Sequence, residues 1–294
     1  MSLKFNIGNV DVHRIVEQEG GFFDPMEFFP DMSKEVLAEN LPWLRPKFVH
    51  PVTGKLILCI QSYLLRTTHH TILVDTCVGN HKSRPGREFW DMMKSDQYER
   101  NLAAAGVDVS EVDYVMCTHL HMDHVGWNTR LVDGRWVPTF PNARYLVSGV
   151  ELAYWDKLYR ENPSRINWIE DSVLPVVEAG LVDVVRSDHA VDDNVVLTPT
   201  PGHTIDHFSV RVQQNGQRAL ITGDMIHSPV QCRYPEIGIF RDHDRALGNH
   251  TRRRVLEDLC DTPGLLCTAH FASPSVGTIS RWGDGFRYNE VAGH

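Results

Sequence analysis

The amino-acid sequence predicts one α/β domain that spans residues 1–294. Apolar runs typical of buried strands alternate with stretches of helical periodicity, and neither an internal repeat nor a linker interrupts them. A chain of 294 residues is long enough to bury one large core. Residues that can bind metals follow several of the apolar runs directly, and open sheets place their ligands at such strand ends.

Residues 1–55 contribute paired strands and an aromatic segment. Apolar residues alternate from Leu3 to Glu17, which predicts two strands with a turn near Gly8-Asn9. The following segment, 20–30, has little periodicity and contains four phenylalanines: Phe22, Phe23, Phe28 and Phe29. Apolar side chains usually line small-molecule sites, so these four are candidates for the wall of a substrate pocket. They can equally plug one end of the core.

The rest of the chain alternates between strands and helices. Strands are predicted at 56–66, 71–76, 113–118, 143–147, 182–186, 195–199, 208–212, 219–222 and 265–268, with a final pair within 278–289. Helices are predicted at 88–105, 149–160 and 242–259. Residues 126–141 are expected to form a loop that turns at Asp133-Gly134, and Asn215-Gly216 predicts a hairpin turn.

Composition limits the partners and the location. The chain carries 29 basic and 38 acidic side chains, whereas nucleic-acid binding depends on dense positive charge, so we expect no nucleic-acid partner. No apolar run reaches the roughly 18 residues of a membrane span. The N-terminus lacks a secretory pattern, and a cytoplasmic location is therefore expected. The six cysteines include no C-x-x-C pair and are predicted to be buried free thiols.

The densest group of chemically active side chains follows the strand predicted at 113–118. His119 and His121 are two residues apart on an extended chain, so both can face one metal ion. Asp123 and His124 lie where the chain turns toward Gly126, and they can face a second ion. Imidazole nitrogen and carboxylate oxygen are ligands that zinc prefers. The alternative interpretation is a polar turn with solvated side chains.

Further polar residues follow other apolar runs. Asp75 ends one strand, where it either caps the next loop or orients a metal-binding histidine. His203 stands in a glycine-containing turn, and its side chain is free to face a shared site. His207 is interpreted as a residue behind that site or in the core. Asp224 and His270 each follow a short strand.

The order of these motifs resembles the metallo-β-lactamase superfamily over residues 56–271. The motifs are D-T at 75–76, H-x-H-x-D-H at 119–124, P-G-H-T at 201–204, G-D at 223–224 and A-H at 269–270. The resemblance implies an αββα sandwich, in which helices flank two central mixed sheets and a dinuclear metal site lies at one sheet edge. Cys77 departs from the family, which often has glycine after D-T.

The resemblance also implies roles for individual residues. His119, His121 and His203 would hold the first metal, Asp123, His124 and His270 the second, and Asp224 would bridge them, with Asp75 behind the motif. Two divalent ions are therefore expected as cofactors. Zinc is the metal we expect, and manganese, iron and cobalt are alternatives because availability and geometry decide among them.

Two features favour one branch of the superfamily. Di-iron oxygen reductases of this fold have a glutamate where His121 stands. The stretch G-D-M-I-H-S-P-V-Q at 223–231, together with the aromatic N-terminal segment, resembles the lactonase and methyl-parathion-hydrolase group. In the lactonases closest to acyl-homoserine lactones a tyrosine often lies three residues after the bridging aspartate, and here that residue is His227.

This resemblance implies hydrolysis of a small molecule. Two cations about 3.5–4 Å apart can hold a bridging hydroxide that attacks a carbonyl group. A small apolar lactone or a carboxylic ester is the expected substrate; a phosphotriester or a thioester is the alternative, and a non-enzymatic metal-binding sensor is the rival class. Asp123, Asp224 and His227 are the predicted catalytic residues, His227 as a proton donor or else as a loop-stabilising residue. A homodimer is compatible with the sequence.

Overall fold

A computed structural model describes residues 4–291, and these divide into two compact units. Unit 1 contains the residues up to Glu17 and those from Ile60 to His189, and unit 2 contains Gln18–Cys59 and the residues from Ala190 onward. Strands β2 (Val10–Phe23) and β3 (Leu56–Arg66) each begin in one unit and end in the other. The prediction of a single domain stays a prediction.

One sheet has seven strands in the order β1-β2-β3-β4-β5-β8-β9. Strand β1 (Lys4–Ile7) pairs with β2 as the sequence predicts, and β3 pairs antiparallel with β4 (Thr71–Val74). Strands β4, β5 (Tyr114–Met116), β8 (Arg144–Ser148) and β9 (Val182–Val185) are parallel neighbours. Because β4 and β5 run in parallel, the residues that follow them, Asp75 and Thr118, meet at one edge.

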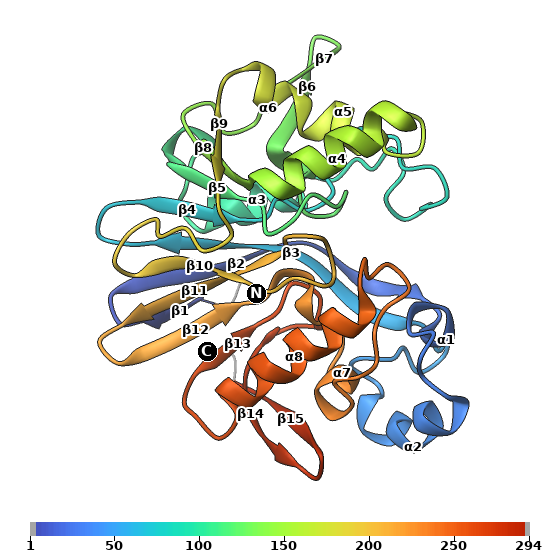
Figure 1. Cartoon of the computed structure of the whole chain (residues 1–294). Coiled ribbons are helices and arrows are strands. Elements are labelled where there is room, and N and C mark those ends of the chain that lie inside the picture. The colour runs from blue at the N-terminus through green and yellow to red at the C-terminus, as the bar shows by residue number, and fades with distance from the viewer. Residues whose placement is uncertain (1–3, 292–294) are drawn as a thin grey trace. The chain divides into compact units, whose positions relative to one another are not determined.

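Helices of unit 1 pack around its parallel strands (Figure 1). They are α3 (Gln97–Ala104), α4 (Gly149–Glu161), α5 (Asn167–Ser172) and α6 (Leu174–Glu178). Helix α4 packs on β8, and α5 contacts both α4 and α6. The side-chain oxygen of Ser148 caps α4 by accepting from the backbone N–H groups of Val150 and Glu151. The helix predicted at 149–160 is confirmed.

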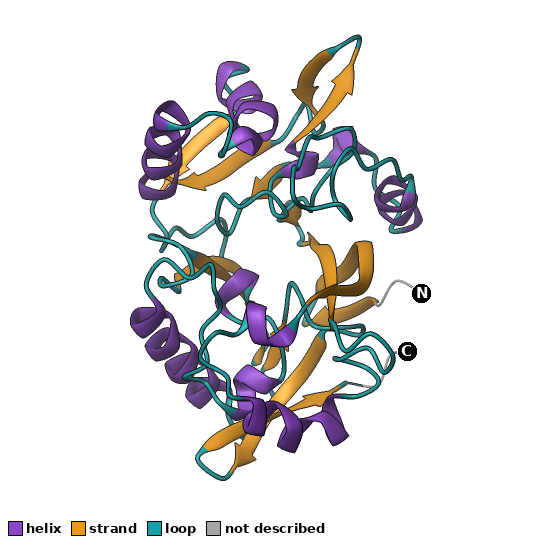
Figure 2. Ribbon diagram, turned by 90° about the vertical axis from the view of Figure 1, so that its right-hand side faces the viewer, coloured by secondary structure: helices purple, strands orange, loops and turns teal. Residues whose placement is uncertain are grey.

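Two expectations for unit 1 are wrong in part. Only Gln97–Ala104 of the predicted helix 88–105 is helical, because the preceding backbone bonds to residues outside it: Met92 N–H donates to Lys82 O (2.8 Å) and His81 N–H to Met93 O (2.8 Å). The expected loop 126–141 contains a hairpin, β6 (Thr129–Val132) and β7 (Arg135–Pro138), which turns at the predicted Asp133-Gly134. Figure 2 shows this hairpin projecting beyond the helices of unit 1.

The second sheet has six strands in sequence order and lies in unit 2. They are β10 (Val195–Pro199), β11 (Phe208–Gln214), β12 (Gln217–Ile221), β13 (Leu265–Cys267), β14 (Val276–Trp282) and β15 (Gly285–Glu290). All neighbours are antiparallel except β12 and β13. The parallel pair brings the residues that follow it, Asp224 and His270, to the same end of the sheet.

Helices of unit 2 include one that the sequence predicts and three that it does not. Helix α8 (Arg245–Leu259) packs on β14 and lies within the predicted 242–259. The others are α1 (Pro25–Phe28), α2 (Lys34–Leu44) and α7 (Val230–Arg233). The segment 20–30 is less irregular than expected, since β2 continues to Phe23 and Asp24 caps the single turn of α1.

The predicted α/β class is confirmed, because mixed sheets with flanking helices make up the structure. The predicted thiols are confirmed too: all six cysteines are free, and Cys260 alone among them is partly exposed. Within residues 4–291, no helix combines the length and the apolarity that crossing a lipid bilayer requires.

Candidate metal centre

Asp75 organises the H-x-H-x-D-H motif of unit 1. Its carboxylate is 3% exposed and accepts three hydrogen bonds, from Thr118 N (2.8 Å), Thr118 Oγ1 (2.9 Å) and His124 Nδ1 (2.9 Å). The left-handed backbone of Asp75 (φ 58°) turns the chain directly after β4, so that the side chain reaches the end of β5. Asp75 thus contacts a histidine of the motif, and the interpretation that it orients a metal ligand stays a prediction.

These bonds fix the tautomers of two histidines. Thr118 gives its hydroxyl hydrogen to Asp75, so it accepts from Nδ1 of His119 (3.1 Å). His124 donates from Nδ1 to Asp75. Both rings therefore carry their hydrogen on Nδ1 and keep a lone pair on Nε2, the form in which imidazole binds metals. Nε2 of His119 lies 2.9 Å from Nδ1 of His121, and Nε2 of His124 lies 3.9 Å from Oδ2 of Asp123.

Tryptophans of unit 1 support the same motif from the other side. The ring of His121 packs edge-on against Trp155, with the ring centroids 5.2 Å apart. Trp168 donates from its indole N–H to the carbonyl oxygen of Leu120 (2.7 Å). Both tryptophans are buried, and they restrain the chain between the first two histidines.

Asp224 is the centre of a second cluster, in unit 2. Its Oδ1 lies 2.8 Å from Nε2 of His270, and its Oδ2 lies 3.3 Å from Nε2 of His203 and 3.1 Å from Nε2 of His227. These four side chains are between 3% and 4% exposed. The two oxygens of one buried carboxylate thus face different histidines.

The Nδ1 atoms of His270 and His203 are anchored. Nδ1 of His270 lies 2.9 Å from the carbonyl oxygen of Cys59, which can only accept, so Nδ1 carries the hydrogen. Nδ1 of His203 lies 2.9 Å from Oδ1 of Asp242. Both rings therefore present Nε2 to the cluster, and this atom carries a lone pair whenever the ring is neutral. The sequence does not mark Asp242 as a site residue, because an acid next to the start of a helix usually caps that helix.

His207 lies behind Asp224 and is fully buried. Its Nε2 accepts from the backbone N–H of Asp224 (3.0 Å), and its Nδ1 lies 2.8 Å from Oγ1 of Thr200. The glycine before His203 is required by space as well as by conformation: Gly202 has φ 128°, and an added Cβ would lie 2.3 Å from the backbone of Gly248. Both features hold the turn 200–204 and the residues after β12 in place.

The pKa values of His203 and His227 are shifted in opposite directions. Burial disfavours the charged form of His203, but hydrogen bonds to Asp224 and Asp242 outweigh this effect and raise its pKa to about 9. The site between the two carboxylates therefore favours a positive charge. For His227 burial prevails over the attraction of Asp224 and lowers the pKa to about 4, so this ring is neutral near pH 7. The role of His227 as a proton donor stays a prediction.

Aromatic rings adjoin the cluster of unit 2. The ring of Phe28 lies 5.5 Å from that of His227, 5.1 Å from Phe23 and 5.7 Å from Phe240, centroid to centroid. Phe240 is 38% exposed and was not among the predicted pocket residues, because a single exposed phenylalanine in a loop carries no pattern. Phe28 is itself buried at 5% exposure, as are Phe29 at 0% and Phe22 at 8%.

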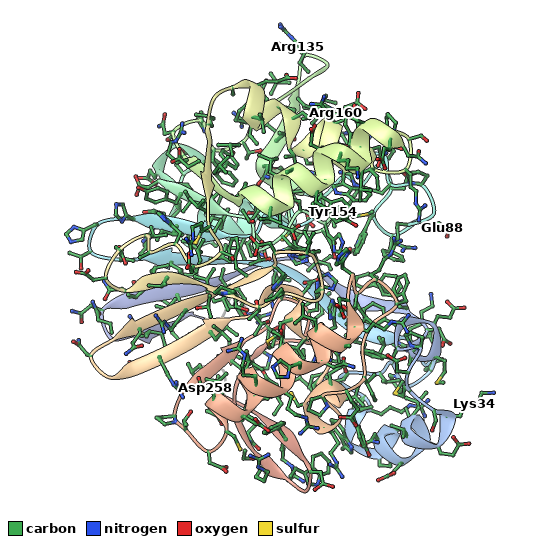
Figure 3. All side chains as sticks on the ribbon, in the orientation of Figure 1. Lys34, Glu88, Arg135, Tyr154, Arg160 and Asp258 are labelled. Carbon is green, nitrogen blue, oxygen red and sulfur yellow. The ribbon has the colours of Figure 1, made fainter. Side chains whose placement is uncertain are left out.

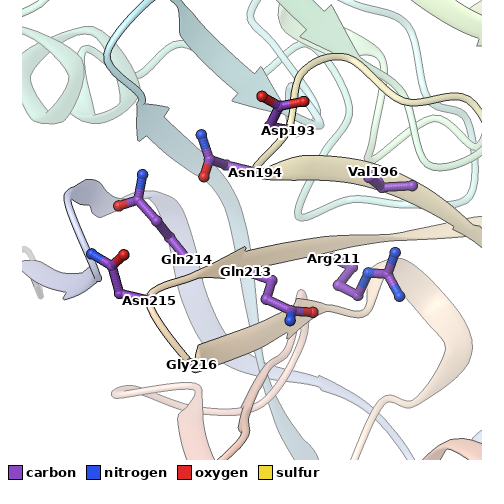
Figure 4. Close-up of a pocket in the computed structure, with 8 residues that line it drawn as sticks. All are labelled: Asp193, Asn194, Val196, Arg211, Gln213, Gln214, Asn215 and Gly216. Carbon is purple, nitrogen blue, oxygen red and sulfur yellow. The ribbon is translucent and has the colours of Figure 1, made fainter.

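Charged side chains outside the clusters mostly point to solvent, as Lys34, Arg135 and Asp258 do in Figure 3. One open polar hollow of about 380 Å³ lies on β10 and β11, where Asn194, Arg211 and Gln213 line it (Figure 4). It lies at the end of these strands opposite to His203, since Asn194 precedes β10 and His203 follows it. The hollow is therefore separate from the cluster of unit 2.

The donor atoms in each unit suit divalent ions. Tetrahedral zinc binds imidazole nitrogen at about 2.0–2.1 Å, which places neighbouring ligand atoms roughly 3.3 Å apart. The pair His119–His121 is 2.9 Å apart and the pair His203–Asp224 is 3.3 Å apart. In addition, Nδ1 of the buried His227 has no hydrogen-bond partner among residues 4–291. Nitrogen and carboxylate donors with anchored second atoms are what zinc sites contain.

The chain is similar in sequence to proteins of one family. The sequence profile of the metallo-beta-lactamase superfamily matches residues 60–270. An N-acyl homoserine lactonase of Bacillus thuringiensis is 28% identical over 184 residues, 58% of this chain and 66% of its own length. The chain spans less than two thirds of the curated relatives it matches first, between 44% and 66%.

Two solved structures share the fold over nearly all of the chain. The hydrolase AbOPH of the beta lactamase superfamily aligns with a TM-score of 0.82 at 21% identity, covering 99% of this chain and 97% of its own. AidC, a dizinc quorum-quenching lactonase in complex with a product, N-hexnoyl-L-homoserine, aligns with a TM-score of 0.80 at 19% identity and the same coverage. At these identities the likeness concerns the fold.

Proposed function

The chain belongs to the metallo-β-lactamase superfamily, and we propose that it is a dinuclear metal-dependent hydrolase that opens a small apolar lactone or cleaves a carboxylic ester. The observation that carries the proposal is the geometry of Asp224, whose two oxygens face different histidines, His270 at 2.8 Å and His203 at 3.3 Å. A carboxylate that serves one ion needs no such arrangement, whereas a carboxylate shared by two ions does.

The family and the anchored tautomers support the ligand assignment. His119, His121 and His203 would hold one ion, Asp123, His124 and His270 the other, and Asp224 both. Bound there, two divalent ions supply an activated water and a polarised carbonyl group. Zinc is supported by the imidazole and carboxylate donors and by the dizinc lactonase of the same fold. Manganese, iron and cobalt remain alternatives.

The chain's own residues orient the ligands and hold the protons. Asp75, Asp242 and the carbonyl of Cys59 fix the rings that carry the metal-binding nitrogens. Asp224 is the proposed resting place for the proton that the attacking water releases, and it would pass this proton to the leaving oxygen. Nε2 of His227 lies 3.1 Å from Oδ2 of Asp224, so this ring either shares in the transfer or holds the carboxylate.

The substrate class is proposed from the relatives and from the aromatic rings. Phe28 adjoins His227, which itself contacts Asp224, and Phe23 packs on Phe28, so an apolar acyl or ring group could lie against these rings. Phe22 and Phe29 are buried and would support this wall from behind. The N-acyl homoserine lactonase of Bacillus thuringiensis directs the proposal toward lactones that carry an acyl chain.

The test is hydrolysis by the purified, zinc-loaded protein of a panel: short- and long-chain acyl lactones, an aryl ester and a phosphotriester. His203→Ala removes a proposed ligand, and His250→Ala, at an exposed site on α8, is the matched control. We expect lactones to react fastest, two zinc ions per chain, and loss of activity in the first variant alone. Inert lactones beside a reactive phosphotriester would refute the substrate class, and one ion per chain would refute the dinuclear centre.

A further inference from the structure

Glu17 is a buried carboxylate that the proposed function does not use. It lies on β2 within unit 1, and its side chain accepts three hydrogen bonds: Val78 N to Oε2 (2.9 Å), Gly79 N to Oε1 (3.1 Å) and the indole Nε1 of Trp127 to Oε1 (2.5 Å). Glu17 is 4% exposed. An acid is costly to bury, so three converging donors need an explanation.

The donors come from two segments, and both adjoin the H-x-H-x-D-H motif. Val78 and Gly79 end the loop 75–79, which begins with Asp75, the residue that binds His124. Trp127 lies three residues after His124, the last residue of the motif. Glu17 therefore ties the loop on one side of the motif to the turn on the other.

Backbone hydrogen bonds join the same two segments to each other. Thr76 N donates to the carbonyl of His124 (2.8 Å), Gly126 N to that of Cys77 (2.8 Å) and Trp127 N to that of Thr76 (2.7 Å). The approach is so close that a Cβ on Gly126 would lie 1.8 Å from the carbonyl oxygen of Val78. Motion of the loop therefore moves the backbone that carries His124.

Aromatic stacking secures the outer end of this arrangement. The rings of Trp127 and Tyr98 are stacked, 5.0 Å apart and 9° from parallel. The hydroxyl of Tyr98 lies 3.3 Å from Oγ of Ser62, which lies 3.4 Å from Sγ of Cys77. The stack fixes the indole N–H that Glu17 accepts, so the carboxylate has one position in which all three donors are satisfied.

We propose that Glu17 is a positioning residue for the metal centre: it clamps the loop 75–79 against the turn 124–128 and so sets the direction in which His124 and Asp123 present their donor atoms. The inference rests on the proposed function, which makes those two residues metal ligands. Glutamine at position 17 has nearly the same shape but places an amide NH₂ against at least one N–H donor, so it opens the clamp.

The experiment compares wild type with Glu17→Gln and with Glu19→Gln, a matched change on the same strand whose carboxylate binds Ser273 instead. Metal-free protein is titrated with cobalt(II) against a chromophoric chelator, which gives the two dissociation constants and the visible absorption of each bound ion. We expect Glu17→Gln to weaken one of the two constants by about 10–100-fold, the usual effect of removing a group that orients a ligand. The other constant should change by less, about threefold or under, since His119 is reached only indirectly, through Thr118 and Asp75.

A further readout separates positioning from general stability. Amide hydrogen exchange of Val78 and Gly79 in the metal-free protein should accelerate in Glu17→Gln, and kcat should fall more than KM rises. Faster exchange with both cobalt constants and the cobalt spectrum unchanged would overturn the inference and leave the proposed function standing. Wild-type protein that binds no cobalt would overturn both. If Glu17→Gln does not fold, Glu17→Asp, which keeps the charge but shortens its reach, is expected to show the same selective loss.

Discussion

Replacing Asp75 by asparagine should separate the orienting role of its charge from its volume. The carboxylate accepts from Thr118 N, Thr118 Oγ1 and His124 Nδ1 at 2.8–2.9 Å. Asparagine fills the same space and leaves no cavity. Its NH₂ group must take the place of one oxygen, however, where it faces the N–H of Thr118 or the two donors of the other side.

The magnitude follows from this count of bonds. At least one hydrogen bond to a buried charged acceptor is lost, worth about 1.5–3 kcal/mol, and the bonds that remain weaken because the acceptor becomes neutral. We expect the free energy of unfolding of the metal-free protein to fall by about 2–4 kcal/mol. Loss of the carboxylate behind His124 should also weaken metal binding by about 10–100-fold, or roughly 1.4–2.7 kcal/mol.

The assay is urea denaturation with excess chelator, paired with zinc titration of the folded protein. Asp113→Asn is the control, because Asp113 is exposed and its Oδ2 accepts a single bond, from Thr71 N (2.7 Å). Equal losses of stability and equal zinc affinities in Asp75→Asn and Asp113→Asn would refute the orienting role of the Asp75 charge. A large loss of stability with unaltered zinc affinity would leave Asp75 a structural role and remove the orienting one.

Two further changes in unit 1 have expected signs. Gly126→Ala should lower the free energy of unfolding by about 3 kcal/mol or more, since the added Cβ would lie 1.8 Å from the carbonyl oxygen of Val78. Gly20→Ala is the control and should leave the stability nearly unchanged, because its Cβ would meet only the Phe22 ring, at 3.7 Å. Equal urea midpoints for the two variants would contradict the prediction. Burial lowers the pKa of Lys82 from 10.5 to about 7, against the attraction of Asp171. Between these pH values the unfolded chain binds a proton that the folded chain lacks, so the folded state gains stability as the pH rises. The free energy of unfolding of the wild type should therefore increase, relative to that of Lys82→Met, by up to about 1.4 kcal/mol per pH unit above pH 7. Parallel stability curves at pH 7, 8 and 9 would exclude that penalty.

Patterns in the sequence predicted the strand ends but not the residues that support them. Asp75, His119, His203, Asp224 and His270 all follow apolar runs, and such runs can be recognised without a structure. From the sequence alone, Asp242 can be interpreted only as an acid that caps a helix, and Glu17 only as an acid within a strand. Their partners lie 39 and more than 60 residues away in sequence, a separation that local patterns do not report.

The prediction of secondary structure was wrong where contacts between residues distant in sequence determine the backbone conformation. Residues 88–96 have apolar spacing suited to a helix, yet Arg84 N donates to Oδ1 of Asp91 (2.5 Å) and Met92 N to Lys82 O. Lys82 itself is held by Oγ1 of Thr129 (2.8 Å) and the ring of Trp136 (3.8 Å to the centroid). The loop is thus fixed to a hairpin 47 residues farther on, and these contacts prevail over a weak helical preference.

The anchors of the histidines explain why the proposed centre needs residues beyond its ligands. His203 and His124 each donate to a carboxylate, of Asp242 and Asp75, whereas His119 and His270 donate to neutral acceptors, Thr118 Oγ1 and Cys59 O. An anionic partner makes imidazole a stronger donor to a metal than a neutral partner does. In the proposed assignment each ion therefore receives one histidine backed by a carboxylate, and the shared Asp224 adds equally to both. In a centre built this way, removal of either backing carboxylate should weaken binding of the ion that it supports more than binding of the other ion.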